Sequence, residues 1–251
     1  MRRFDAWIRS LSGATELIIV VVVAFGWFIV GSVRSFVAAL ASSHQLPPMT
    51  EWDFIELVLQ EAFVLIFLGW FLWRRGWTLA QFGLVWHQRP IRKSLTLAIG
   101  HQILWGAGLV FCVVLPSAVI TPVLQALLPQ SVAVMTDSSL LLAPGVGLGV
   151  ILIVSLLNPI FEEVFLCGYL ISKLAPAQGT WFAINVSTAI RFTYHLYQGP
   201  IGAISIILVG LIFAYWFAHR RQLWPLIIAH ACLDFLFLFA ALQLAAPVRG
   251  L

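Results

Sequence analysis

The chain has 251 residues, of which 61% are hydrophobic and only 10% are charged. Soluble domains carry about 25% charged residues, and a soluble chain of this length needs a polar surface. The composition therefore excludes an ordinary soluble enzyme. The net charge of +4 is not gathered into a basic stripe, so no nucleic-acid partner is expected. We expect an all-α protein embedded in a lipid bilayer.

Apolar stretches of the length needed to cross a membrane, about 20 residues, recur along the chain. They lie at residues 15–33, 54–73, 95–117, 140–170, 180–198, 201–218 and 223–245. The sequence predicts a polytopic bundle of seven spans, or eight if the proline-containing stretch 118–139 enters the membrane. A helix over residues 145–174 would be about 45 Å long, so it must tilt, kink at Pro159 or leave the membrane.

Basic residues fall mainly in alternate loops, which orients the spans. One side receives Arg2, Arg3, Arg9, Arg74, Arg75, Arg89, Arg92, Lys93, Lys173, Arg220 and Arg221, and the other receives Arg34 and Arg249. We therefore predict a multi-pass protein of the plasma (inner) membrane with a cytoplasmic N-terminus. Residues 1–94 are predicted to form a two-span region with a basic cytoplasmic loop, and residues 95–251 a membrane-embedded core.

A group of ionisable residues lies inside the predicted spans of this core: Glu162, Glu163, Arg191, His195, His230 and Asp234. A charge at the bilayer centre costs about 2.5–3.5 kcal/mol, so four unpaired charges would cost roughly 10–14 kcal/mol. That cost is comparable with the whole stability of a domain, about 5–15 kcal/mol. The groups must therefore be paired, protonated or hydrated in a shared cavity, which makes them candidates for a functional site.

The spacing of these residues suggests how they meet. Arg191 and His195 are four residues apart and share a helix face, as do His230 and Asp234. Glu162 and Glu163 are adjacent, about 100° apart around a helix. Only one of the two can point straight at a substrate, so the other is expected to support the site or bind a counter-ion.

The residues occur in an order that resembles the three motifs of the CAAX prenyl endopeptidase family, which also includes bacterial bacteriocin-processing and self-immunity proteins. Glu162-Glu163 followed by Gly168 resembles the first motif, EExxxR, often followed by glycine. His195 matches the histidine of the second motif, FxxxH, and His230 with Asp234 resembles the third, HxxxN or HxxxD. The resemblance covers roughly residues 140–240.

A second stretch, residues 75–84 with the sequence RGWTLAQFGL, is similar to a run that recurs in the family before the next span.

The resemblance implies an intramembrane endopeptidase that hydrolyses a peptide bond in a membrane-associated protein or peptide. A glutamate would activate the water, and no metal cofactor would be needed. Glu162 would act as general base, with Glu163 beside it, and His195 would assist the water. His230 and Asp234 would stabilise the oxyanion or orient the substrate carbonyl. Cleavage is expected near the cytoplasmic face.

Two positions depart from the motifs. Cys167 replaces the arginine of the first motif, and Arg191 replaces the phenylalanine of the second. We hypothesise that the cation balancing Glu163 has moved from one helix to its neighbour. The alternative is that loss of the arginine marks an inactive enzyme.

Three other functions stay open. The same fold could be a zinc protease with Glu162, His195 and His230 as ligands, because three such ligands and a water suit catalytic zinc. It could be a catalytically inactive bacteriocin-immunity or peptide-binding protein. A proton-coupled transporter is less well supported, because inverted repeats and matched broken helices are absent from the sequence. The sequence predicts neither the substrate nor the oligomeric state.

Depth in the membrane raises a further question. Counted at about 1.5 Å per residue, Glu162 and His230 lie roughly 13–17 Å from the inner helix ends, and His195 about 24 Å. The helix with His195 must therefore tilt, or the hairpin over residues 180–218 must lie deeper in the membrane. Three other ionisable residues have no partner at helical spacing and are expected to be structural: Glu56, Glu61 and His101.

Overall fold

A computed structural model describes residues 2–42, 48–85, 95–127, 142–143 and 145–245. Within these ranges the secondary structure is helical, apart from a single β-bridge between Met49 and Leu142. The elements are α1 (Arg2–Ser10), α2 (Gly13–Ser42), α3 (Glu51–Arg74), α4 (Leu95–Leu127), α6 (Leu148–Glu162), the π-helix η3 (Glu163–Ile171), α7 (Ser172–Gln178), α8 (Thr180–Tyr194), the 3₁₀ turn η4 (Leu196–Gln198), α9 (Gly199–Arg220) and α10 (Trp224–Ala245). The prediction of an all-α polytopic bundle is confirmed.

Six helical segments in the described ranges are long and apolar enough to cross a membrane: Gly13–Ala41, Glu51–Arg74, Thr96–Leu127, Leu148–Gln178, Leu196–Arg220 and Trp224–Leu244. The other predicted span, residues 180–198, forms α8 and η4. Because α8 has 15 residues, it is about 22 Å long and falls short of the ~30 Å hydrocarbon core. The predicted number of seven is reached only when this short helix is counted.

The prediction for the stretch after residue 117 was partly wrong. The third span was expected to end at residue 117, but α4 continues through Pro116 and Pro122 to Leu127. Proline is tolerated in membrane helices because neighbouring helices and local adjustments satisfy the freed backbone groups. Residues 118–127 therefore extend the third span, and residues 128–139 lie outside the described ranges.

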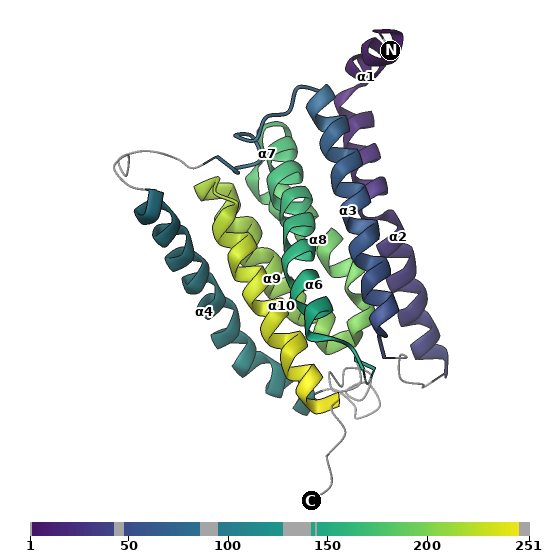
Figure 1. The fold of residues 1–251 in the computed structure, drawn as a ribbon, viewed down its shortest axis with the longest axis vertical. Coiled ribbons are helices and arrows are strands. Elements are labelled where there is room, and N and C mark those ends of the chain that lie inside the picture. The colour runs from purple at the N-terminus through teal and green to yellow at the C-terminus, as the bar shows by residue number, and fades with distance from the viewer. Residues whose placement is uncertain (1, 43–47, 86–94, 128–141, 144, 246–251) are drawn as a thin grey trace, which may run out of the picture.

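The helices are arranged with the long α6–η3–α7 segment in the middle of the bundle (Figure 1). Helices α2 and α3 lie on one flank, and α9, α10 and α4 lie on the other. One hydrophobic core includes residues of α2, α3, η3, α8, α9 and α10. Both parts of the predicted division, residues 1–94 and 95–251, thus contribute to the same core.

The run over residues 75–84 forms a compact turn after α3 that contacts two other elements. The Leu223 amide, just before α10, donates a hydrogen bond to the Gly83 carbonyl at 3.0 Å. Gly83 has φ +72°, a conformation that favours glycine. Phe82 packs so close to Gly168 that a Cβ there would lie 3.2 Å from the Phe82 carbonyl oxygen. These contacts explain why Gly83 and Gly168 are needed where the turn packs against its two neighbouring segments.

A buried carboxylate anchors the same end of the bundle. Glu16 in α2 is only 2% exposed and accepts hydrogen bonds from Arg75 Nε at 2.6 Å and Lys173 Nζ at 2.8 Å. Trp77 Nε1 and the Tyr169 hydroxyl also donate to it, each at 3.1 Å. This Glu16 cluster fixes α2 and the segment after α3 against η3 and α7.

Candidate active site

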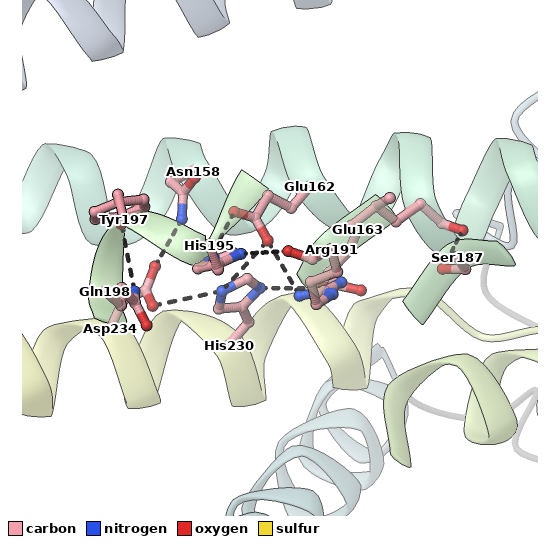
Figure 2. Close-up of polar contacts among 11 residues, drawn as sticks. Asn158, Glu162, Glu163, Ser187, Arg191, His195, Tyr197, Gln198, His230 and Asp234 are labelled. Carbon is pink, nitrogen blue, oxygen red and sulfur yellow. Dashed lines mark hydrogen bonds and ion pairs between the residues drawn. The ribbon is translucent and has the colours of Figure 1, made fainter. Parts of the chain in front are cut away.

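The two adjacent glutamates lie where the central segment changes from α-helix to π-helix. Glu162 is the last residue of α6 and Glu163 the first of η3. π-Helical turns inside α-helices occur frequently at functional sites. Both side chains are buried, at 3% and 0% exposure, and they point toward α8 and α10 (Figure 2).

The glutamates have different surroundings. Glu163 Oε1 accepts hydrogen bonds from Arg191 Nη2 at 2.6 Å and from His230 Nδ1 at 2.8 Å. Glu162 lines a cavity, whereas Glu163 is not among the residues that line it. This geometry agrees with the expectation that only one carboxylate of the pair can face a substrate.

Arg191 on α8 joins both glutamates. It is 1% exposed, and besides its bond to Glu163 its Nη1 donates to Glu162 Oε2 at 3.1 Å. The guanidinium also lies over the Phe213 ring, 5.8 Å from the centroid. Cys167 is buried within interaction range of Glu163 and Arg191. Arg191 therefore occupies the neighbourhood of residue 167, as the hypothesis of a relocated cation requires.

The two histidines present ring nitrogens to the two oxygens of Glu162. His195 Nε2 is 3.9 Å from Oε1, and His230 Nε2 is 3.9 Å from Oε2. His195 Nδ1 lies 2.9 Å from the Arg191 carbonyl oxygen, which can only accept, so Nδ1 donates and Nε2 is directed at Glu162. Arg191 thus holds the carboxylates through its side chain and orients His195 through its backbone.

Asp234 lies one helical turn beyond His230. Its Oδ1 is 3.4 Å from His230 Nε2, and its Oδ2 accepts a hydrogen bond from Asn158 Nδ2 at 3.0 Å. Asn158 is one turn before Glu162 on α6, so its hydrogen bond to Asp234 links α6 to α10 (Figure 2). The structure thus brings together all six residues named from the sequence.

The length of the central helix accounts for the depth of Glu162 relative to His195. Because helical structure continues from Leu148 through Gln178, Glu162 lies about 24 Å from the Gln178 end. His195, 15 residues after Thr180, lies about 22 Å from the start of α8. The earlier count for Glu162 was too small because it took the helix to end near Lys173.

A cavity of about 540 Å³ leads away from Glu162 and His195. Its walls come from α2, α3, α6, η4 and α10, and it reaches Met49 and Asp53 at the start of α3. That end of α3 is opposite to Arg74 and to helix α1 (Figure 1). The cavity therefore lies in the half of the bundle away from the basic helix ends, a feature that the sequence did not indicate.

Sequence reasoning missed two residues near the site. Asn158 lies in the first motif region, but no charge marked it. Glu61 was expected to be structural, yet it is 2% exposed, lines the cavity, and is within electrostatic range of Glu162, Asp234 and His230. The cost of a charge inside a span, which singled out Glu162, applied equally to Glu61. By contrast, His101 is bonded to Trp105 on its own helix α4.

The donor atoms grouped closely enough to hold a metal ion differ by one residue from the zinc ligands considered from the sequence. In the part of the chain that the structure describes, Glu162, Glu163 and His230 offer ligand atoms within 4.8 Å of one another, and His195 is not in this group. Arg191 already binds both carboxylates, so an added dication would face a guanidinium at 2.6–3.1 Å from the same oxygens. This donor set fits a cationic side chain better than it fits zinc.

The fold and the site define a multi-pass membrane protein with an acid–histidine centre buried in the bundle. Residues 144–236 match the family model described as type II CAAX prenyl endopeptidase Rce1-like. This match includes every residue of the candidate site and agrees with the resemblance that the motifs indicated. No significant match is found among curated proteins or among solved structures.

Proposed function

We propose that this protein is an intramembrane endopeptidase in which Glu162 activates a water molecule to hydrolyse a peptide bond of a membrane-associated protein or peptide. One observation carries the proposal: Glu162 faces the cavity with a histidine nitrogen 3.9 Å from each of its oxygens. A separation above 3.5 Å between polar atoms leaves room for a bridging water. A carboxylate and an imidazole on one water are suited to general-base catalysis.

In this mechanism the water lies between Glu162 Oε1 and His195 Nε2. Glu162 takes its proton as the oxygen attacks the substrate carbonyl, and His195 holds the water through Nε2. The protonated Glu162 then returns the proton to the leaving amine.

His230 is the group placed to meet the oxyanion. Its Nδ1 is held by Glu163, so Nε2 faces Glu162 Oε2 at 3.9 Å and Asp234 Oδ1 at 3.4 Å, and a protonated Nε2 would be a donor beside the general base. A fixed donor of this kind lowers the barrier because it needs no reorganisation during the reaction. Asp234, bonded to Asn158, would orient His230 from the wall of the cavity.

The position of Arg191 favours an active enzyme over the inactive immunity-type alternative. An enzyme that had lost its motif arginine without replacement would leave Glu163 as an unpaired buried charge. Here Arg191 supplies that pairing at 2.6 Å. The geometry likewise favours a metal-independent glutamic protease over the zinc-dependent version.

We also propose that the N-terminus is cytoplasmic and that the protein resides in the plasma (inner) membrane. Arg9, Arg74, Lys173 and Arg220 lie at helix ends on one side of the bundle, as the positive-inside rule expects. In this orientation the cavity occupies the outer half of the membrane. This position of the cavity argues against the expectation of cleavage near the cytoplasmic face.

The test is cleavage of a quenched-fluorescence peptide library by purified protein in lipid nanodiscs. Wild type is compared with Glu162→Gln and His195→Ala, each with and without a chelator. The matched controls are Glu51→Gln and His219→Ala, which change the same residue types outside the cavity. Cleavage that resists chelator and is lost only in the two site variants supports the proposal. Loss on chelation, with restoration by Zn²⁺, would support the zinc enzyme instead.

A further inference from the structure

The wall of the cavity formed by α3 is acidic. Asp53, Glu56 and Glu61 all line it, together with the uncharged Gln60. Asp53 and Glu56 are exposed toward the start of the helix, whereas Glu61 is buried next to the catalytic centre. Among the lining residues there is no lysine or arginine. A cleft lined by one sign of charge attracts the opposite sign.

Glu61 is the unusual member of this wall. It is 2% exposed, and its Oε2 has no hydrogen-bond partner among the described residues. A buried carboxylate oxygen without a partner is unfavourable, so such an atom in a cavity wall indicates a missing ligand. The permanent cation nearest the centre, Arg191, is already bonded to Glu162 and Glu163. Glu61 thus has no counter-ion in the described chain.

We propose that Glu61 forms a subsite that binds a basic side chain, lysine or arginine, of the substrate beside the scissile bond. This inference rests on the proposed function and names the class of substrate: a polypeptide segment with a basic residue at a fixed position. Glu61 lies within electrostatic range of Glu162, so the basic residue would be near the bond that is cut. Asp53 and Glu56 would attract the segment to the mouth of the cavity.

Other groups around Glu61 suit a peptide better than a free metal ion. Gln60, Gln198, Asn158 and Tyr197 line the same cavity and can bond to peptide amides and carbonyls. Apolar side chains, including Trp27, Phe28 and Leu238, complete the walls. A cavity of about 540 Å³ has room for several residues of an extended chain.

The test uses peptides that differ only by lysine, norleucine or glutamate at one position, with that position moved stepwise along the cleaved sequence. At the preferred position we expect wild type to favour lysine over norleucine by about 10- to 100-fold in kcat/KM, the range of a desolvated charge pair. Glu61→Gln should reduce this ratio to less than about threefold, and Glu61→Lys should favour the glutamate peptide. Glu51→Gln, on the same helix but not among the residues that line the cavity, should keep the preference.

Binding of the same peptides to Glu162→Gln protein, measured by fluorescence anisotropy, separates this inference from the proposed function. A lysine preference in binding that needs Glu61 supports the subsite even if wild type cuts nothing, which would refute only the protease. Cleavage without a lysine preference, or with one that survives Glu61→Gln, overturns the subsite and leaves the protease standing. Failure of the lysine peptide to bind or be cut overturns the subsite as well.

Discussion

Arg191 Nη2 lies 2.6 Å from Glu163 Oε1, so the buried glutamate of one helix is neutralised by an arginine of the next. In the family motifs that the chain resembles, the arginine is expected four residues after Glu163, where this chain has Cys167. Arg191 therefore neutralises the motif glutamates from a different position in the backbone.

The relocated cation can be tested by moving it back. Arg191→Phe should destabilise the protein by about 3–5 kcal/mol, because it leaves Glu163 buried without its cation. The double variant Arg191→Phe with Cys167→Arg should recover at least half of the lost Tm and part of the activity. Thermal unfolding in detergent measures the first effect, and peptide cleavage the second. An Arg191→Phe protein as stable and active as wild type would show that the ion pair is dispensable.

Asp234 is predicted to act through its hydrogen bonds rather than through its charge. Asp234→Asn can still accept from Asn158 and face His230, so kcat should fall less than about tenfold. Asp234→Leu removes both contacts and should reduce kcat by about 10²-fold or more. Equal loss in the two variants, with unchanged Tm, would mean that the carboxylate charge itself is required.

The Glu16 cluster should contribute substantially to stability. Glu16→Gln keeps the shape of the side chain but leaves Arg75 and Lys173 without their shared carboxylate, and we expect a cost of about 3 kcal/mol. The measurement is chemical or thermal unfolding in detergent. Glu51→Gln on α3, outside this cluster, is the control and should change stability by less than about 0.5 kcal/mol. Similar curves for the two variants would contradict the structural role assigned to Glu16.

Two glycines with positive φ give a matched pair for the turn after α3. Gly83→Ala adds backbone strain and places a Cβ 2.7 Å from the Arg221 carbonyl oxygen, whereas Gly76→Ala adds strain with nothing within 4 Å. Both should lose about 1–3 kcal/mol from strain, and Gly83→Ala should lose about 2 kcal/mol more from the clash. Equal losses of Tm would show that the turn does not pack against the end of α9.

The sequence predicted the helical class, and it singled out the six ionisable residues that the fold brings together, because both leave strong marks. Long apolar stretches indicate spans, and six ionisable residues inside those stretches are costly enough to require a shared site. A pairing of Arg191 with Glu163 could also be hypothesised from the sequence, because the first motif lacks its arginine and the second motif has an additional one.

Other features depend on tertiary contacts that a single sequence does not carry. The path of α4 through Pro116 and Pro122 depends on how freed backbone groups are satisfied, and the π-helix at Glu163 leaves no periodic signal. Glu61 could not be paired with the site by spacing, because α3 meets α6 only through folding. The side on which the cavity opens is equally a property of the packed bundle.

The most direct test of the central claim is the kcat of Glu162→Gln on the peptide that wild type cleaves best, measured with folded protein of unchanged Tm. A general base of this kind contributes about 10²–10⁴-fold, so the account predicts a loss in that range that chelator does not alter in wild type. A Glu162→Gln protein that cleaves the peptide within a few-fold of the wild-type rate would contradict the assignment of Glu162 as the base.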